Sequence, residues 1–305
     1  MRRAYLVIIA LVILGVLAFT IIGLWEESRA KLSRRGGSAL EVKFRELMRR
    51  DEEFRRAVSE LRSMLLDPSK PFDEDRAMVL FNEVLSKLEL GPLPEGIRYG
   101  KGRLLEFAVG EKPRCAKVRL WEFMRIHQPR VDVEAGNGLE AIYLCARPSG
   151  REYLVEVTLV FSDEDKPGED LYYDAWRLVS WGRARDIETF FVVLDPSARL
   201  VKRVVFEGLY LSLRNCARPI APIYGLAGFS RSSHRSWSEH VNVETIDVYV
   251  NTWNHALALE DANPHLKHVT YTFSNTTVVV GSRLDAELNY SDIPYTSEAL
   301  VVRGG

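Results

Sequence analysis

The stretch Leu139–Phe161, LEAIYLCARPSGREYLVEVTLVF, decides the fold class. Two runs of aliphatic, aromatic and β-branched residues, Leu139–Cys145 and Tyr153–Phe161, flank Arg147-Pro148-Ser149-Gly150. Such runs are typical of strands, and proline and glycine between them are typical of a tight turn. The stretch therefore predicts a β-hairpin.

Similar runs recur along the chain from Gly96 onward, separated by Gly, Pro and Asp clusters rather than by long helices. Asp195-Pro196-Ser197-Ala198 predicts a second hairpin. Many strands separated by turns favour a mainly β fold, an antiparallel β-sandwich of about 200 residues, which we place at residues 92–305. The other predicted strands are residues 104–109, 116–123, 187–194, 200–206, 243–250, 269–273 and 276–280.

The N-terminal residues 4–25, AYLVIIALVILGVLAFTIIGLW, contain no charged side chain. At 1.5 Å per residue this run forms a helix about 33 Å long, enough for a hydrocarbon core about 30 Å thick. A cleaved signal peptide is the alternative, but its apolar region has only about 7 to 15 residues and ends at an A-x-A site, which is missing here. We expect residues 1–25 to be a signal-anchor, a single-pass transmembrane helix in the lipid bilayer.

The orientation of this anchor follows from its flanking charges. Met1-Arg2-Arg3 favours an internal N-terminus, whereas the basic residues within 29–35 favour the opposite arrangement. A short basic tail ahead of a large domain favours a cell-membrane protein with an extracytoplasmic C-terminal domain. Asn275-Thr276-Thr277 and Asn289-Tyr290-Ser291 match the glycosylation acceptor pattern, but two matches are near chance for this length.

Residues 26–91 predict a helical segment. Asp51 and Asp73 each precede an amphipathic run and are typical N-caps, while Asp67-Pro68 and Gly91-Pro92 are typical stop signals. Each piece has only a few turns and no sustained heptads. This pattern favours a short helical stalk or cap over a partner-binding coiled coil.

Composition excludes several classes of protein. The 41 Lys and Arg residues and the 42 Asp and Glu residues give a net charge of −1. The chain therefore lacks the excess of basic residues that is typical of nucleic-acid-binding proteins. Hydrophobic residues make up 47% of the chain and charged residues 27%, which excludes a disordered chain.

The three cysteines, Cys115, Cys145 and Cys216, lack the spacing of a zinc ribbon and are too few for a disulfide scaffold. An extracytoplasmic domain allows one disulfide with one thiol left over. Because Cys145 lies in an apolar strand, a buried free cysteine is the favoured interpretation.

The first candidate site lies in Trp181–Glu188, WGRARDIE, which leads into a predicted strand. Side chains alternate along a strand, so Asp186 and Glu188 project to the same face. Two such carboxylates are suited to bind a divalent cation as a cofactor. They are also suited to act as a general acid and a general base, one in each role. The alternative is that they pair with Arg183 and Arg185 at the strand entrance.

Histidines supply the second candidate site. Five of the six lie within 35 residues, but no pair has the HExxH or HxH spacing of a zinc site, and an isolated histidine is usually structural. His255, which follows a predicted strand, and His240 are the candidates for ligand binding. Aromatic rings able to stack on a ligand are those of Trp176, Trp181, Trp237 and Trp253.

The two candidate sites together form a pattern: Gly-x-x-x-Asp-x-Glu entering a strand, then a hairpin, a polar loop and Asn-His-Ala-Leu. This pattern resembles the necrosis- and ethylene-inducing-like proteins and the related vacuolar-protein-sorting-type β-sandwich domains. The matching residues are Gly182, Asp186, Glu188 and Asn254–Leu257, within residues 172–259.

The resemblance implies a secreted β-sandwich. It also implies a divalent-cation site in which Asp186 and Glu188 are metal ligands and Asp174 is the upstream ligand. Arg183 and Arg185 stand where that family has histidines, so a cation at this position would face two positive charges.

Three functions fit the sequence. The first is a non-catalytic binding module for a surface glycan, a lipid head group or a partner protein, with Asp186, Glu188, His255, His240 and Trp181 as ligand-binding residues. The second is a membrane-anchored hydrolase using the two carboxylates with a histidine. The third is a subunit of a membrane or cell-envelope assembly. Without a GxSxG elbow, P-loop, Rossmann fingerprint or HExxH motif, an enzyme is the less favoured class.

Overall fold

The structure is a computed structural model that describes residues 39–66, 72–100, 113–207 and 236–291. The chain forms two compact units, Met1–Ser38 and Ala39–Gly305. Every described residue belongs to the second unit. No helix in the four described ranges is long and apolar enough to cross a membrane. The predicted anchor, the predicted strand at 104–109, His234 and Cys216 lie outside the described residues.

The described chain opens with three helices, α2 (Ala39–Arg50), α3 (Glu52–Leu66) and α4 (Glu74–Lys87). The predicted N-caps of α3 and α4 are confirmed. Asp51 accepts a hydrogen bond from the Phe54 amide at 3.0 Å, and Asp73 accepts one from the Arg76 amide at 3.0 Å. These carboxylates satisfy amides that a first helical turn leaves without intrahelical partners.

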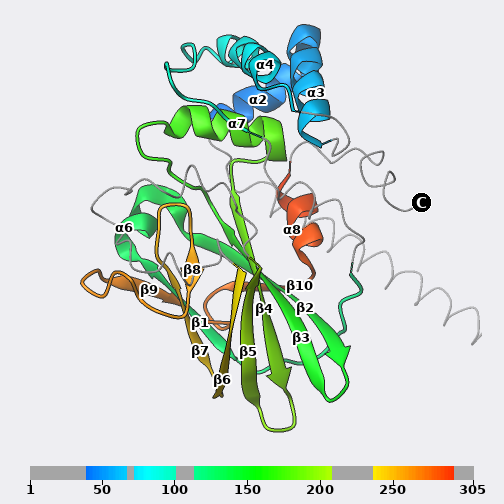
Figure 1. The fold of residues 1–305 in the computed structure, drawn as a ribbon, viewed down its shortest axis with the longest axis vertical. Helices are drawn as coiled ribbons and strands as arrows, with labels where there is room; N and C mark the ends of the chain where they lie inside the picture. The colour runs from blue at the N-terminus through cyan, green and yellow to red at the C-terminus, as the bar shows by residue number, and fades with distance from the viewer. Residues whose placement is uncertain (1–38, 67–71, 101–112, 208–235, 292–305) are drawn as a thin grey trace, which may run out of the picture. The chain divides into compact units, whose positions relative to one another are not determined.

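A further helix, α7 (Asp170–Trp181), is absent from the sequence prediction and lies beside these three (Figure 1). Buried side chains of all four helices form one apolar cluster, in which Phe81 contacts Trp176 edge to face with ring centroids 5.0 Å apart. Arg62 of α3 donates a hydrogen bond to the Val179 carbonyl of α7 at 2.9 Å. The N-terminal helices therefore pack on the β-rich part of the chain through α7.

The large sheet has six strands among the described residues, in the order β10–β2–β3–β4–β5–β6 (Figure 1). Neighbours pair antiparallel except β10 and β2, which are parallel. The two predicted hairpins are confirmed as β2–β3 and β4–β5. The strands are β2 (Leu139–Ser149), β3 (Glu152–Phe161), β4 (Asp186–Asp195), β5 (Leu200–Glu207), β6 (Ser236–Val243) and β10 (Thr277–Val280).

The small sheet has four strands within the described ranges, in the order β8–β7–β1–β9. Strands β1 and β7 are parallel, and the other two pairs are antiparallel. After β1 the chain forms the short helix α6 and a π-helical turn, η1. The elements are β1 (Met124–Pro129), α6 (Arg130–Asp132), η1 (Val133–Asn137), β7 (Ile246–Val250), β8 (Leu257–Ala258) and β9 (His268–Tyr271).

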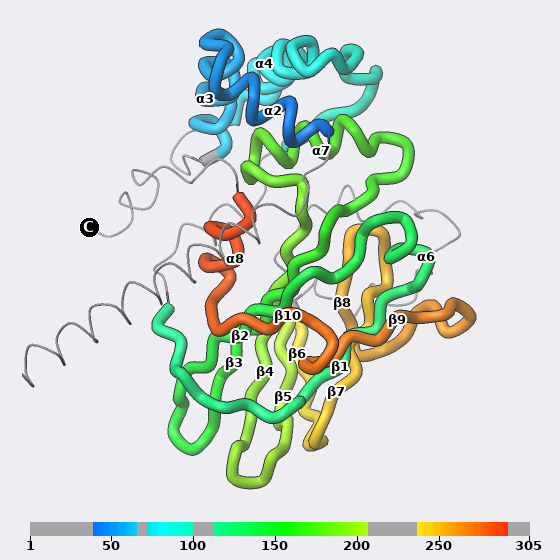
Figure 2. The backbone as a smooth tube through the Cα atoms, turned by 180° about the vertical axis from the view of Figure 1, so that it is seen from behind, coloured from blue at the N-terminus to red at the C-terminus, as the bar shows by residue number. Residues whose placement is uncertain are grey.

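Both sheets contribute to one apolar core. Ile126 and Val248 of the small sheet are buried in the same cluster as Leu159 and Phe190 of the large sheet. On these strands every second residue is buried in the cluster, as the two-residue period of a strand requires. The fold is thus mainly β and sandwich-like, with two mixed sheets and a few helices (Figure 2).

Three parts of the fold prediction are wrong. Two strand pairs are parallel, because the chain crosses between the sheets and local patterns carry no information on crossovers. The predicted strand at 116–123 contributes one isolated bridge, from Ala116 to Ala146. The predicted strand at 243–250 is divided into two strands at residues 244–245.

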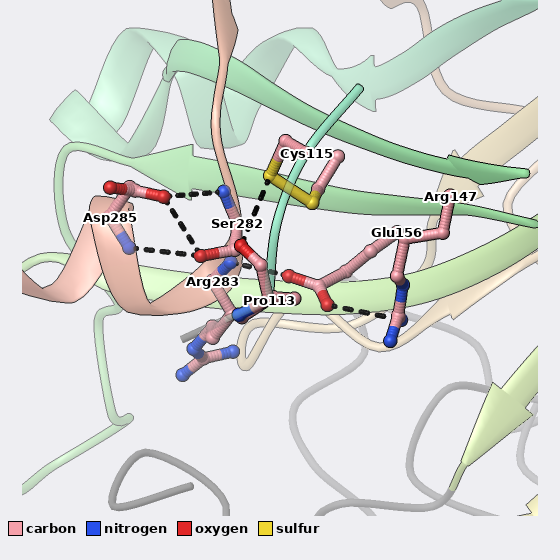
Figure 3. Close-up of a disulfide and its surroundings, with 8 residues drawn as sticks. Pro113, Cys115, Arg147, Glu156, Ser282, Arg283 and Asp285 are labelled. Atoms are coloured by element: carbon pink, nitrogen blue, oxygen red, sulfur yellow. Dashed lines mark hydrogen bonds and ion pairs between the residues drawn. A yellow bond between two sulfur atoms is a disulfide. The ribbon is translucent and has the colours of Figure 1, made fainter. Parts of the chain in front are cut away.

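The last described helix, α8 (Arg283–Tyr290), packs against the face of the large sheet that points away from the shared core. Ser282 and Asp285 form a capping box at its start (Figure 3). The Arg283 amide donates a hydrogen bond to the buried Glu156 of β3 at 2.5 Å. This contact fixes the N-terminus of α8 on the sheet, because the amides of a first helical turn favour a carboxylate.

Cys115 and Cys145 form a disulfide (Figure 3). The interpretation of Cys145 as a buried free thiol is therefore wrong. The bond joins the segment ahead of β1 to β2, next to the bridge between Ala116 and Ala146, and spans 30 residues of sequence. Spacing alone does not select this pair, because the two cysteines meet only when the chain before β1 lies along β2.

Replacing Cys145 with serine should lower the free energy of unfolding by about 3.6 kcal/mol, the loop-closure entropy expected for a loop of this size. Urea unfolding of the full chain in detergent measures the loss, and dithiothreitol should produce a similar loss in the unmodified protein. Thiol titration of the unfolded, non-reduced chain should find one reactive thiol, Cys216. Three reactive thiols would contradict the pairing.

Candidate functional site

Four ionisable side chains meet at the end of the core where β3 ends and β4 begins. Asp186 is the first residue of β4, His255 lies in the loop between β7 and β8, Asp132 ends α6, and Arg177 lies on α7. Each is more than nine-tenths buried. We call these four residues the His255 cluster.

The backbone of His255 has an uncommon conformation. Its φ is 48°, in the left-handed region that histidine enters more often than most residues. A hydrogen bond of 3.0 Å from its amide to the Thr252 carbonyl closes a tight turn. The imidazole stacks on Phe161 with ring centroids 4.0 Å apart, so both the turn and the stack orient the ring.

Each ring nitrogen of His255 faces a carboxylate. Nδ1 lies 2.9 Å from Oδ2 of Asp186, and Nε2 lies 3.4 Å from Oδ2 of Asp132. Asp132 is itself held by the side-chain amides of Gln128 and Asn137, at 2.5 and 3.0 Å. The imidazole therefore bridges two carboxylates, one from each side of the core.

Arg177 brings four carboxylates together around one guanidinium. The shortest nitrogen–oxygen distances are 3.4 Å to Asp163, 3.4 Å to Glu164, 3.7 Å to Asp174 and 3.8 Å to Asp186. Asp186 thus has Arg177 on one oxygen and His255 on the other. This shared carboxylate connects α7 to the loop after β7.

The electrostatic balance favours charge on His255 and its neighbours. Burial opposes the imidazolium, but the carboxylates of Asp132 and Asp186 at its two ring nitrogens outweigh this effect and raise the pKa of His255 to about 10. Burial also opposes ionisation of Asp186, yet His255 and then Arg177 lower its pKa to about 2. The pKa of Asp132 is lowered against burial by the same imidazolium. At neutral pH a cation therefore lies between two anions.

Three neighbouring carboxyls behave in the opposite way. Burial, followed by the charge of Asp186, raises the pKa of Glu164 to about 8. Burial and nearby carboxylates raise the pKa of Asp174 to about 8, and the pKa of Glu188 lies well above its ordinary value for the same reasons. Glu164 and Asp174 are therefore mainly protonated at neutral pH. The two cations and two anions of the His255 cluster then balance each other.

The side chains of the His255 cluster are buried. A general acid or base must come within hydrogen-bond distance of the group it serves. His255 is fully buried, with a carboxylate at each ring nitrogen. A groove of about 640 Å³ between α3 and α4 is lined by none of the four cluster residues. In the described part of the chain, the cluster therefore places charged groups inside the fold.

The alternative pairing of Asp186 and Glu188 with the two neighbouring arginines is wrong. Arg183 is buried and makes two hydrogen bonds to Glu287 of α8, at 2.8 and 2.9 Å. Arg185 donates to Glu140 of β2 at 3.0 Å. The arginines thus point to other carboxylates and join the start of β4 to α8 and β2.

The predicted cation site finds no support in the described residues. Asp186 and Glu188 share one face of β4, as predicted, opposite Phe161 and Leu159 of β3. Arg177 lies between Asp174 and Asp186, so a guanidinium takes the place that a cation would fill. In the described part of the chain, no group of three or more His, Cys, Asp and Glu residues is arranged to hold a metal ion.

The remaining predicted ligand-binding residues lie elsewhere. Trp181 is partly buried beneath the guanidinium of Arg183, 5.6 Å from the ring centroid. His240 is exposed on β6, opposite Arg203. Of the five predicted ligand-binding residues, the structure therefore gathers only the two carboxylates of β4 with His255. The other three tryptophans do not form an exposed platform beside them, since two are buried and one stacks on a core ring: Trp176, Trp253 and Trp237.

The sequence analysis missed Asp132, Glu164 and Arg177. The spacing of Asp174 and Arg177, three residues apart, was the available signal for an ion pair on a helix. Asp132 follows β1 at an irregular turn and belongs to no motif. Its role depends on the path of the chain after β1, which brings it to His255.

A second polar cluster, also missed, lies on the small sheet. Asp247 accepts two hydrogen bonds from the Arg125 guanidinium, both of 2.8 Å. The His127 imidazole lies 2.7 Å from Asp247 and 3.1 Å from the Thr270 hydroxyl, and stacks on Tyr249 with ring centroids 4.8 Å apart. These residues alternate with core residues and point away from the core. We call these five residues the small-sheet face.

No protein family, curated protein or solved structure matches the chain significantly. The resemblance to the necrosis- and ethylene-inducing-like proteins stays a prediction from short motifs.

Replacing His255 with asparagine should lower the free energy of unfolding by about 3 to 5 kcal/mol, because Asp132 and Asp186 would lose the cation between them. Urea unfolding of the full chain measures this loss. The matched control is His240→Asn on an exposed site, expected within about 0.5 kcal/mol of the unmodified protein. Equal effects of the two substitutions would contradict the buried ion cluster.

Stability should also depend on pH through His255. Because folding raises its pKa from 6.5 to about 10, its contribution is complete below pH 6.5 and lost as the pH rises through about 10. Glu164 and Asp174 add a decline that ends near pH 8. Between pH 8 and 10 the melting temperature should therefore fall less in His255→Asn than in His240→Asn. Parallel pH profiles of the two variants would refute this assignment.

Proposed function

We propose that this protein is a single-pass membrane protein whose β-sandwich domain lies outside the cytoplasm and acts as a non-catalytic binding module. The observation that carries the proposal is the disulfide between Cys115 and Cys145. Disulfides persist in oxidising compartments and are rare where thiols are kept reduced. The apolar residues 4–25 supply a transmembrane anchor of sufficient length, and the helical segment joins this anchor to the sandwich.

The closed geometry of the His255 cluster supports a non-catalytic role over the hydrolase alternative. A hydrolase using Asp186, Glu188 and a histidine needs these groups to line a pocket. All three side chains here are buried, and His255 is engaged by carboxylates on both sides. Their chemistry is that of an internal ion cluster, whose partners are other parts of the same chain.

The small-sheet face is the better candidate for ligand binding. It presents a guanidinium, an imidazole, a carboxylate, a phenol and a hydroxyl on three adjacent strands. Arg125 is 47% and Asp247 33% exposed. Because these side chains hold one another in place, little conformational entropy is lost when a ligand docks.

A surface glycan suits the small-sheet face better than a lipid head group. A phosphate head group favours a free guanidinium or ammonium. Arg125 is already paired to both oxygens of Asp247. The face instead offers a balanced set of donors and acceptors, which matches the hydroxyl groups of an uncharged sugar.

The membrane orientation is testable on intact cells. Protease added outside should digest the domain from Ala39 onward, whereas an epitope tag placed ahead of Met1 should stay protected. The expected result follows from the short basic tail and from the disulfide. A domain that stays intact while a control surface protein is cleaved would refute the proposed location.

The binding surface is testable on a glycan array with the detergent-solubilised full chain. The double variant Arg125→Ala, Tyr249→Ala should lose about tenfold or more in affinity for the bound glycans, which corresponds to about 1.4 kcal/mol. The matched control is Arg203→Ala, His240→Ala on the large sheet, which should bind like the unmodified protein. Equal binding by both double variants would refute the small-sheet face, and binding of no glycan would refute a glycan ligand.

A further inference from the structure

Two segments of the chain have the Asn-x-Ser/Thr pattern of a glycosylation acceptor. The two segments differ in how accessible they are in the structure. We propose that Asn275 carries an N-linked glycan and that Asn289 does not. This inference rests on the proposed extracytoplasmic location, since N-glycans are added on that side of a membrane.

Asn275 lies at an exposed turn between β9 and β10, where the chain passes from the small sheet to the large sheet. Phe273, two residues earlier, packs on the core with its ring 5.4 Å from that of Phe123. One end of the turn is therefore fixed, and Asn275 is exposed while its Oδ1 accepts hydrogen bonds from the Thr272 amide at 2.7 Å and the Thr276 hydroxyl at 3.1 Å. Its Nδ2 donates one hydrogen bond, to the Thr270 carbonyl at 3.1 Å, and an amide NH₂ has two hydrogens.

The hydroxyl residue of the first acceptor is also accessible. Thr277 is exposed and begins β10, which lies at the edge of the large sheet among the described strands. An acceptor needs both the asparagine amide and this hydroxyl in reach of the transferase. At Asn275 both groups lie outside the folded core.

The second acceptor is built into the fold. Asn289 lies on α8 and donates a hydrogen bond of 2.9 Å to the hydroxyl of Tyr143, a fully buried residue. Tyr290 is buried, and the Ser291 hydroxyl donates to the Trp181 carbonyl at 2.7 Å. Presenting this segment to a transferase would require α8 to leave the sheet.

The reaction at Asn275 is a glycosyl transfer from a lipid-linked oligosaccharide. A bond forms between Nδ2 and the anomeric carbon of the first sugar. The bond from that carbon to the lipid phosphate oxygen breaks, and the lipid phosphate leaves with the electron pair. The amide nitrogen gives up one proton to a base of the transferase, and nothing is oxidised or reduced.

The experiment is translation of the full chain with microsomes that contain an oligosaccharyltransferase. An additional acceptor appended after Gly305 reports whether the domain has entered the lumen. We expect two endoglycosidase-sensitive mobility shifts, one from the appended acceptor and one from Asn275. Asn275→Gln and Thr277→Val should each remove one shift, whereas the matched control Asn289→Gln should keep both.

The outcomes separate this inference from the proposed function. A single shift, from the appended acceptor alone, overturns the Asn275 site while leaving the domain outside the cytoplasm. Loss of a shift in Asn289→Gln also overturns the assignment. If neither shift appears and protease added outside intact microsomes digests the domain, the proposed location is refuted. The assignment of Asn275 is then refuted as well.

Discussion

The junction between the two sheets and α7 depends on the compensation of charge around His255. An imidazolium inside an apolar core requires anions close by, and Asp132 and Asp186 supply them from different elements. Arg177 adds a second cation from α7 on the far oxygen of Asp186. A buried ion pair adds little net stability compared with well-packed apolar side chains. Removing any one partner is nevertheless strongly destabilising, because it leaves a charge buried alone.

The charged side chains of the segment after α7 contact several different elements of the fold. Gly182 ends α7 with a φ of 74°, a conformation that favours glycine. Arg183 then reaches α8, and Arg185 reaches β2. Asp186 points to the core face of β4 and reaches His255. This short charged run thus contacts three other parts of the fold, because successive side chains point in different directions where the helix ends and the strand begins.

Local features of the sequence were predictable where local physics determines them. The caps at Asp51 and Asp73 and the hairpin turn after Arg147 depend on neighbours in the chain, and all three are confirmed. The shared face of Asp186 and Glu188 follows from strand alternation in the same way. Crossovers depend on the path of the whole chain, so the parallel pairs and the disulfide could not be predicted.

Asp186 and His255, two residues of the predicted site, meet in the structure, but Asp186 pairs with His255 and Arg177 rather than with the two neighbouring arginines. Paired carboxylates at a strand entrance are typical of a ligand site only when the entrance is open, and openness is a tertiary property. The small-sheet face shows the converse. His127 lies opposite Tyr249 on one side and Thr270 on the other, more than 100 residues away in sequence. No motif connects these three residues, because strand register alone makes them neighbours. A cluster of polar side chains on the face of a sheet is therefore invisible to motif analysis, whereas two carboxylates that are close in sequence predict a site even where they are buried.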